Sequence, residues 1–231
     1  MTVTAIIAEF NPFHNGHQLL AQAAREAGGE NSAVVAILSG NWVQRGAPAL
    51  LPKGARARAA LLSGIDLVME LPLAHAMATA ERFAYGGIAL AEALGCVDRL
   101  AFGSETGALP PREQFAAALL DPKVAADRPE RRGEGLSYAA ARQQAVARRL
   151  GEEAAAPLSR PNDTLAVQYL YELQRRKSPI HPFTIPRQGA GHHDPSGDEG
   201  SATASAAGVR ERFQAGDPEA ARPYLPPASW E

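Results

Sequence analysis

The sequence has little cysteine, little lysine and no long apolar run. Cys96 is the single cysteine among 231 residues, which excludes an intramolecular disulfide and a cysteine-rich zinc site and favours a reducing compartment. We expect Cys96 to be a small buried apolar residue. No stretch approaches the roughly 18 apolar residues of a membrane span, and the N-terminus lacks the basic start and cleavage site of a signal peptide. The sequence therefore predicts a soluble, cytoplasmic protein with no membrane partner.

Neither sign of charge is in excess. The 23 Lys and Arg residues against 25 Asp and Glu give a formal net charge of -2, and three of the 23 are lysine. This balance excludes a basic field over the whole chain, so any RNA contact must be a local patch. Six arginines of the second half, interspersed with glutamates, are either such a patch or a solvated charged face: Arg128, Arg131, Arg132, Arg142, Arg148 and Arg149.

Short β-branched apolar runs alternate with amphipathic stretches along the chain. This alternation predicts an α/β fold, an open parallel sheet with helices on both faces, followed by a more helical C-terminal part. The expected strands lie at 3–8, 33–38, 66–70, 97–102 and 180–185. The expected helices lie at 16–27, 55–62, 79–94, 113–120, 138–150 and 163–176.

Small or polar residues follow three of these expected strands. They are Asn11 to His17, Ser39 to Asn41 and Gly103 to Glu105. In open parallel sheets, ligands bind beyond the carboxyl ends of the strands. We therefore expect the three loops to converge on one crevice.

The strongest functional signal lies between the first expected strand and the helix that follows it. His14-Asn15-Gly16-His17 places two imidazoles on one side of a helix's first turn, with a glycine where the backbone can approach a ligand. A helix N-terminus attracts phosphate, and imidazole N–H groups can donate to phosphoryl oxygens as charge develops on them. The segment therefore predicts nucleotide phosphate chemistry, with His14 and His17 as catalytic residues.

Two other interpretations of the histidine pair stay open. The imidazoles can hold a metal ion, but no third cysteine, histidine or carboxylate stands at a recognisable spacing, so we expect no protein-ligated metal. The histidines can also be purely structural.

Longer motifs carry a resemblance to a known family. The motifs are A-E-F-N-P-F-H-N-G-H (8–17), S-G-N-W-V-Q-R-G-A-P-A (39–49), D-L-V-M-E-L-P (66–72), A-E-R-F-A-Y-G (80–86), F-G-S-E-T-G (102–107), G-L-S-Y-A-A-A-R (135–142), P-N-D-T-L-A-V-Q-Y (161–169), T-I-P-R-Q-G-A-G-H-H-D (184–194) and S-A-T-A (201–204). With them the sequence strongly resembles the tRNA(Met) cytidine acetate ligase family, of the nucleotidyltransferase superfamily with the H-x-G-H motif. The resemblance covers nearly the whole chain and implies a Rossmann-like sheet of the nucleotidyltransferase type.

The resemblance also implies an activity and a site. Such an enzyme activates acetate with ATP, forming acetyl-adenylate and pyrophosphate, and acetylates N4 of the wobble cytidine of elongator tRNA(Met). ATP with Mg²⁺, acetate and that tRNA are then the substrates and partners. The ATP-binding residues that the resemblance implies are Ile7, Ala8, Glu9, Phe10, Asn11, Pro12, Phe13, His14, Asn15, Gly16, His17, Gln18, Leu19, Leu20, Gly103, Asn162 and Arg187.

The three residues outside the first loop each have a physical interpretation. Gly103 ends the fourth expected strand and lets the backbone pack against a nucleotide. Arg187 is a permanent cation that can donate two hydrogen bonds to phosphate. Asn162 is expected to be a helix N-cap, whose side-chain oxygen accepts from a first-turn N–H.

Five further residues are softer candidates. Lys53 and Arg56 either contact phosphate or acetate or belong to a solvated helix face. Ser201 and Thr203, with Arg210 downstream, resemble the phosphate-binding turn of nucleotidyltransferases, although family members place the arginine sooner.

Family members continue well past residue 231. We therefore expect a nucleotidyltransferase-like ATP-binding domain over residues 1–188 and a Gly/Ser/Pro-rich segment over 189–231, the remnant of a further tRNA-binding region. Two alternative functions remain open. One is an adenylyltransferase acting on a small phosphorylated metabolite, and the other is a non-catalytic nucleotide-binding module.

Overall fold

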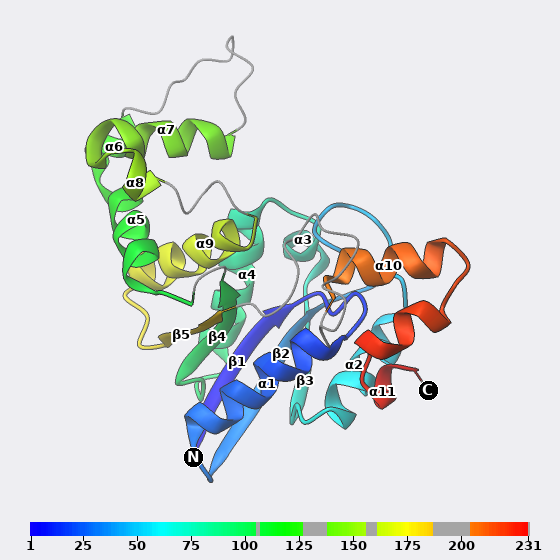
Figure 1. The fold of residues 1–231 in the computed structure, drawn as a ribbon. Helices are drawn as coiled ribbons and strands as arrows, with labels where there is room; N and C mark the ends of the chain where they lie inside the picture. Colours follow the sequence, from blue (N-terminus) through cyan, green and yellow to red (C-terminus); the bar gives the residue numbers. More distant parts are fainter. Residues whose placement is uncertain (105–106, 127–137, 156–160, 187–203, 231) are drawn as a thin grey trace.

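The chain folds around one parallel sheet. The computed structural model describes residues 1–104, 107–126, 138–155, 161–186 and 204–230. Its five strands lie in the order β3-β2-β1-β4-β5, all parallel (Figure 1). They are β1 (Thr2–Ala8), β2 (Ser32–Ser39), β3 (Leu67–Leu71), β4 (Arg99–Ser104) and β5 (His181–Pro186). The expected α/β fold is confirmed. Gly103 lies inside β4 rather than after it, because this strand begins and ends two residues later than expected.

Helices connect the strands and continue after them. They are α1 (Asn15–Gly28), α2 (Lys53–Leu62), α3 (Leu73–Ala76), α4 (Ala80–Ala93), α5 (Pro110–Leu120), α6 (Pro122–Ala126), α7 (Tyr138–Leu150), α8 (Glu152–Ala155), α9 (Pro161–Arg176), α10 (Ala206–Gln214), the 3-10 helix η2 (Glu219–Tyr224) and α11 (Pro227–Trp230). None of the helices in the described ranges has the length and apolarity that a membrane crossing requires.

The start of α9 corrects one prediction. The helix begins at Pro161, so Asn162 lies inside its first turn and is not the residue that precedes the helix. Proline suits the first helical position because its fixed φ is already helical and the N–H that it lacks has no acceptor there. The N-cap role expected for Asn162 is therefore wrong.

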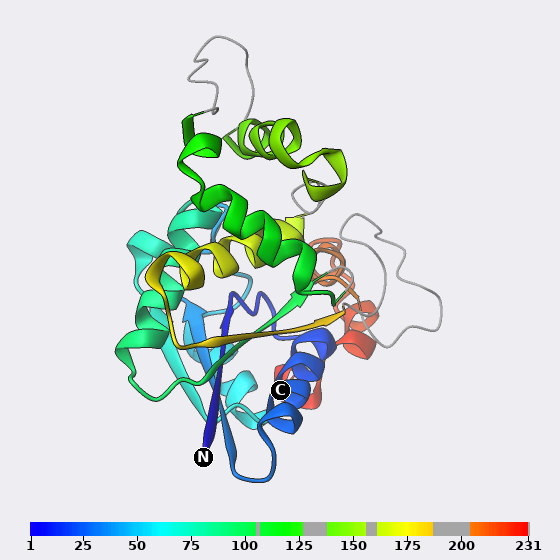
Figure 2. The ribbon, with the colours of Figure 1, turned by 90° about the vertical axis from the view of Figure 1, so that its left-hand side faces the viewer.

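Side chains of β1 alternate between two hydrophobic cores, one on each face of the sheet. Val3, Ala5 and Ile7 join the core beneath α4 and α9, and Ile6 joins the core beneath α1 and α2. Figure 2 shows the sheet between α4 on one side and α1 on the other. Gly87 lets α4 lie close to β1, because a Cβ there would stand 2.5 Å from Cδ1 of Ile7.

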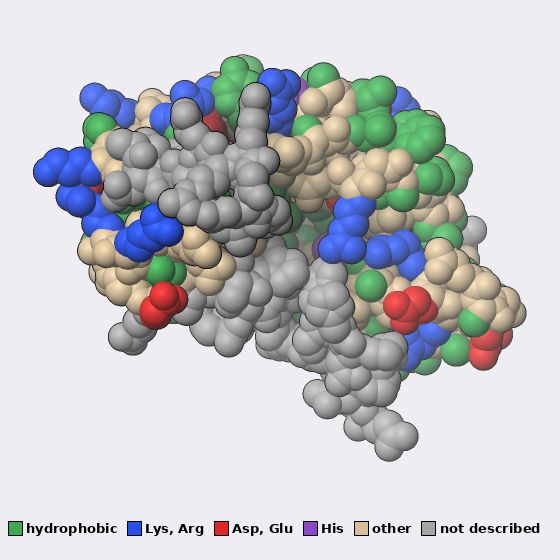
Figure 3. All heavy atoms as spheres, turned by 90° about the horizontal axis from the view of Figure 1, so that it is seen from above, with side chains coloured by type: hydrophobic (Ala, Val, Ile, Leu, Met, Phe, Trp, Pro, Cys, Tyr) green, Lys and Arg blue, Asp and Glu red, His purple; other side chains and the backbone are tan. Residues whose placement is uncertain are grey.

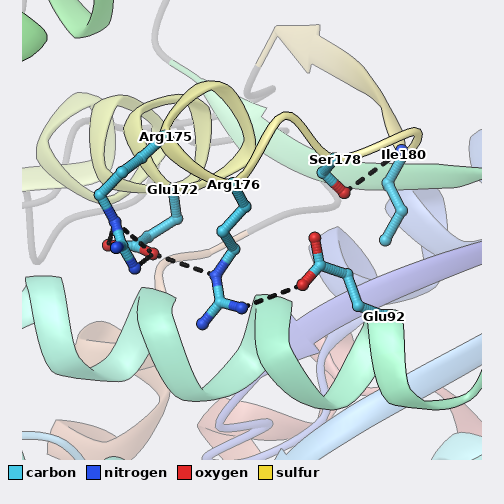
Figure 4. A network of polar contacts seen from close by, with 6 residues as sticks. All are labelled: Glu92, Glu172, Arg175, Arg176, Ser178 and Ile180. Carbon is cyan, nitrogen blue, oxygen red and sulfur yellow. Dashed lines mark hydrogen bonds and ion pairs between the residues drawn. The ribbon is translucent and has the colours of Figure 1, made fainter.

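Ion pairs fix α9 in place against its neighbours. Glu172 accepts from Arg175 at 2.8 Å and from Arg176 at 3.2 Å, and Arg176 also donates to Glu92 of α4 at 3.0 Å (Figure 4). Toward α5, Arg112 Nε donates to the Asp163 carboxylate at 2.9 Å, and both side chains are 3% exposed. These contacts hold the helical layer over the same face of the sheet as α4.

Helices α5 to α8 enclose a small hydrophobic core of their own, beside α9. Of the six arginines expected to form either a patch or a solvated charged face, Arg142 is buried and donates to Glu81 and Gln168, so it belongs to neither. Arg148 and Arg149 are exposed, and Arg149 pairs with Asp121. The other three expected members, at positions 128, 131 and 132, lie outside the described residues.

The last described segment packs back onto the sheet layer. Residues 204–230 form a cluster around Val209, Ala221 and Leu225, and α11 packs against α2. Asn15, at the start of α1, donates through its side-chain amide to the Pro223 carbonyl at 3.0 Å. This segment therefore lies beside the first loop.

Cys96 is exposed, so the expectation that it is buried is wrong. The residue follows Gly95, which has a φ of +68° and ends the α4 region in a turn between the helix and β4. A turn at the surface leaves this side chain in solvent despite its apolar character.

The buried pair of Arg112 and Asp163 leads to a stability prediction. We expect Arg112→Met to lower the free energy of unfolding by about 3–5 kcal/mol, because it leaves the Asp163 charge buried without this partner. The control is Glu219→Gln, which breaks an exposed i,i+3 pair with Arg222 and costs about 1 kcal/mol or less. Urea unfolding measures both, and equal costs would contradict the account.

Candidate functional site

A cavity of about 860 Å³ opens at the carboxyl ends of β1 and β4. Its lining comes from the first loop and α1, the loop after β2, the start of α4, the ends of β4 and β5, the middle of α9 and the start of α10. Figure 3 views this edge from above and shows Lys and Arg side chains beside a hollow with hydrophobic side chains in it. The expected crevice beyond the sheet is therefore present.

The loop between β1 and α1 is tightly packed. Phe10 has a φ of +46°, a region costly for a residue with a side chain, and its ring is 1% exposed. The ring packs edge-on against Phe13 at 4.8 Å and against His17 at 4.9 Å between centroids. Strained backbone held by surrounding packing is frequent at functional sites.

His14 and His17 together cap the N-terminus of α1. His14 is the N-cap, and its Nδ1 accepts from the Gly16 N–H at 3.1 Å, while His17 Nδ1 accepts from the His14 N–H at 3.3 Å. The two rings stack with centroids 3.8 Å apart. A Cβ on Gly16 would lie 2.9 Å from Cε1 of His14, so glycine here makes room for the capping ring.

This reciprocal cap fixes the chemistry of both rings. A nitrogen that accepts a hydrogen bond carries no proton, so the proton of each neutral imidazole is on Nε2. Because both rings line the cavity, the pair brings two N–H donors to the N-terminus of a helix, which itself favours negative charge. Such a site can stabilise charge on a phosphoryl group.

The structure brings most of the expected ATP-binding residues to the cavity. The expected residues that line it are Ile7, Ala8, Glu9, Phe10, Asn11, His14, Gly16, His17, Leu19, Leu20 and Gly103. Pro12, Phe13, Asn15 and Gln18 are not among its lining residues. Thr164 and Tyr169, on the same helix as position 162, line the cavity. Arg187 lies outside the described residues and directly follows Pro186, which is a lining residue.

One of the three expected polar loops does not reach the cavity as expected. Ser39, Gly40 and Asn41 are absent from its lining, and the loop after β2 contributes Val43 to Arg45 instead. Gly40 accepts from Arg56 through its carbonyl, and the Asn41 side chain accepts from the Lys53 N–H at 2.8 Å. These residues are occupied in holding the start of α2.

Arg56 is a structural clamp rather than a phosphate ligand or a solvated side chain. It is completely buried and donates to the carbonyls of Glu9, Gly40 and Leu51. Burial lowers its pKa, whereas the carboxylates of Glu9 and Glu70 raise it. Arg56 therefore ties the loop after β1 to the loop after β2.

Lys53 lies on the surface and pairs with Glu70 at 2.6 Å, each side chain about half exposed. It is not among the lining residues of the cavity. Lys53 therefore belongs to a solvated helix face, which is one of the two roles expected for it.

Positive charge reaches the cavity from α10 and from the loop after β2. Arg210 lines the cavity and donates to the Asn11 carbonyl at 2.7 Å, and Arg45 also lines it. Burial lowers the pKa of Arg210, Glu9 raises it and Arg45 lowers it, so the three charged groups act on one another. Ser205 caps α10 by accepting from the Gly208 N–H, whereas Ser201 and Thr203 lie outside the described residues.

Several residues of this lining had no role predicted from the sequence, among them Gln44, Arg45, Phe83 and Tyr169. All four stand inside the motifs that carry the family resemblance. In the described ranges, no three His, Cys, Asp or Glu side chains gather where they could hold a metal ion.

Comparison with known proteins agrees with the site. A family model described as HIGH Nucleotidyl Transferase matches residues 1–231. A curated tRNA(Met) cytidine acetate ligase of Syntrophotalea carbinolica is 44% identical over 220 residues, which are 94% of this chain and 52% of that protein. The chain thus spans about half the length of the curated relatives that it matches.

Two solved structures have the same fold over the whole chain. The apo crystal structure of Thermotoga maritima TmcAL matches with a TM-score of 0.91 at 34% identity, over 100% of this chain and 55% of that one. A second crystal structure, bound with alpha-thio ATP, matches with a TM-score of 0.89 at 32% identity, over 100% of this chain and 54% of that one.

The Arg56 clamp leads to a prediction for the site's framework. We expect Arg56→Met to lower the free energy of unfolding by about 3 kcal/mol or more, because three carbonyls lose a buried donor. Lys53→Met, on the same helix but in an exposed pair, should cost about 1 kcal/mol or less. Thermal and urea unfolding compare the two, and a cost for Arg56→Met no larger than that of the control would argue against the clamp.

Proposed function

Given that the chain belongs to the HIGH Nucleotidyl Transferase family, we propose that it activates acetate with ATP and acetylates N4 of the wobble cytidine of elongator tRNA(Met). The resemblance predicted from the motifs is confirmed by relatives named tRNA(Met) cytidine acetate ligase. ATP binding is supported by the similar protein that was crystallised with alpha-thio ATP. Acetate, Mg²⁺ and the tRNA belong to the proposal.

One observation carries the proposal. His14 and His17 cap each other at the N-terminus of α1, and both line a cavity at the carboxyl ends of β1 and β4. In a doubly wound sheet this is the position where a nucleotide binds, because the strand order reverses beside β1. The α-phosphate of ATP placed there would meet the Nε2–H groups of both rings.

The proposed reaction has two steps. A carboxylate oxygen of acetate bonds to the α-phosphorus of ATP, and the bond from that phosphorus to the pyrophosphate oxygen breaks. Negative charge increases on the α-phosphoryl and on the leaving pyrophosphate, where His14 and His17 stabilise it. The cytidine N4 then attacks the acetyl carbon, AMP leaves with the bridging oxygen, and the nitrogen loses a proton.

Other groups have supporting roles in this proposal. Arg210 supplies a positive charge at the cavity, and Mg²⁺ enters bound to the ATP phosphates, since it prefers oxygen ligands. Contacts of Gly103, Asn162 and Arg187 with ATP stay predictions, as does the division into residues 1–188 and 189–231. Because ATP and tRNA are cytoplasmic, we expect the protein to act in the cytoplasm.

The test is an assay with radiolabelled acetate, ATP and Mg²⁺, with and without elongator tRNA(Met). We expect AMP, pyrophosphate and labelled tRNA to form together. Acetyl-adenylate and pyrophosphate without labelled tRNA would support activation and exclude transfer by this chain. ATP binding with no acetate-dependent product would overturn the proposal in favour of a nucleotide-binding module, and turnover with a phosphorylated metabolite would favour an adenylyltransferase.

The histidine pair allows variants that separate folding from chemistry. His14→Asn keeps an N-cap acceptor and His17→Gln keeps a side chain able to reach back to the N-cap N–H, but both remove the imidazole. We expect each to lower acetate activation about 10²-fold, or roughly 2.7 kcal/mol of transition-state stabilisation. Melting temperatures should stay near that of the unmodified chain. Unchanged turnover in both variants would remove the proposed mechanism.

A further inference from the structure

One wall of the cavity presents a buried hydroxyl that its surroundings leave unused. Tyr169, in the middle of α9, is 4% exposed and lines the cavity. Its ring packs near Phe102, with centroids 5.7 Å apart, and no hydrogen bond joins its hydroxyl to another residue in the described ranges. A buried hydroxyl without a partner is costly, so an acceptor from a ligand is the expected partner.

Gln44 supplies a second donor without a partner among the described residues, and the residue lies at the same cavity. Gln44 lines it from the loop after β2, and its side-chain Nε2 is buried without a hydrogen-bond partner in the described ranges. The loop is well fixed, because the Val43 N–H donates to the Ala47 carbonyl at 3.0 Å and the Ala49 N–H donates to the Asn41 carbonyl at 2.9 Å. The amide is therefore held in place by its backbone.

Glu9 places the two donors in one region. Its carboxylate accepts from the Gln44 backbone N–H at 2.9 Å. Burial raises the pKa of the Tyr169 phenol, and the Glu9 charge raises it further, so the two groups are close enough to interact and the hydroxyl keeps its proton. Both residues thus lie near Glu9, which follows the end of β1.

The surroundings of these donors fit a small anion with an apolar end. Phe83 and Ala80 of α4 line the same cavity, and Phe83 and Tyr169 belong to the same hydrophobic core. Glu9 interacts electrostatically with Arg56 and with Arg210, and Arg45 interacts with Arg210. These three positive charges offset the negative charge of Glu9. A carboxylate has two oxygens that accept and no proton to donate, which matches two donors.

We infer that Tyr169 and Gln44 bind the carboxylate of the acid substrate, with its methyl group toward Phe83 and Ala80. This inference rests on the proposed function and assigns its acid subsite, defined here as the Tyr169 hydroxyl, the Gln44 side-chain amide and the Phe83 ring. His14 and His17 lie in the first loop and face the phosphates, so acid and nucleotide occupy different parts of the cavity. The two donors hold the attacking oxygen and take no proton.

The test compares the Michaelis constants for acetate and ATP in pyrophosphate release. Tyr169→Phe and Gln44→Leu should each raise KM for acetate at least about tenfold, because a hydrogen bond to a charged group is lost. KM for ATP should stay within about twofold. Gln44→Leu keeps the backbone N–H that donates to Glu9, so the loop contact survives.

Tyr171→Phe is the matched control. Tyr171 stands two residues further on the same helix, is not among the lining residues of the cavity and contacts Arg142 through its ring. This variant should leave both constants unchanged. It separates loss of the Tyr169 hydroxyl from any general effect on α9.

Each other outcome overturns the inference. If Tyr169→Phe and Gln44→Leu leave the KM for acetate unchanged in an active enzyme, the acid subsite is refuted but the proposed function still stands. If Tyr169→Phe raises the KM for ATP as much as the KM for acetate, Tyr169 belongs to the nucleotide contacts instead. If the unmodified chain binds ATP by calorimetry but releases no pyrophosphate with acids of one to four carbons, both proposals are wrong.

Discussion

The candidate site depends on the reciprocal cap between His14 and His17. Each imidazole accepts a backbone N–H through Nδ1, which satisfies two of the donors that a helix N-terminus leaves without partners. The same contacts place the proton of each ring on Nε2 and hold the rings 3.8 Å apart. Gly16 is required because a Cβ there would collide with the His14 ring. One structural device thus starts α1 and places two donors at the cavity.

Distant segments complete the cavity around this cap. Arg56 joins the loop after β1 to the loop after β2 through three carbonyls, and Glu9 joins the same two loops by accepting from Gln44. Arg210 of α10 donates to the Asn11 carbonyl, so the last described segment also braces the first loop. Charge at the site is therefore shared among groups from three parts of the chain, which allows a carboxylate, a triphosphate and Glu9 to lie near one another.

Local patterns in the sequence were enough to predict the sheet and the histidine pair. Buried strands and amphipathic helices have periods that neighbouring residues reveal, and H-N-G-H directly after a strand predicts a phosphate-binding turn. Long-range partners were not predictable. Arg56 could not be recognised as a buried clamp, nor Arg142 as a buried side chain paired with Glu81, because their acceptors stand far away in the sequence. Tyr169 and Gln44 lay in recognised motifs, but only the structure shows that both line the cavity and that the Gln44 Nε2 is buried without a partner in the described ranges.

The most direct measurement is a crystal structure of this chain grown with Mg²⁺ and an ATP analogue that resists cleavage at the α-phosphate. We expect the α-phosphate to lie within hydrogen-bond distance, about 2.7–3.2 Å, of Nε2 of His14 or His17. We also expect both Nδ1 contacts with the backbone to persist in the complex. An analogue bound elsewhere, or bound in the cavity with its phosphates directed away from both imidazoles, would contradict the account.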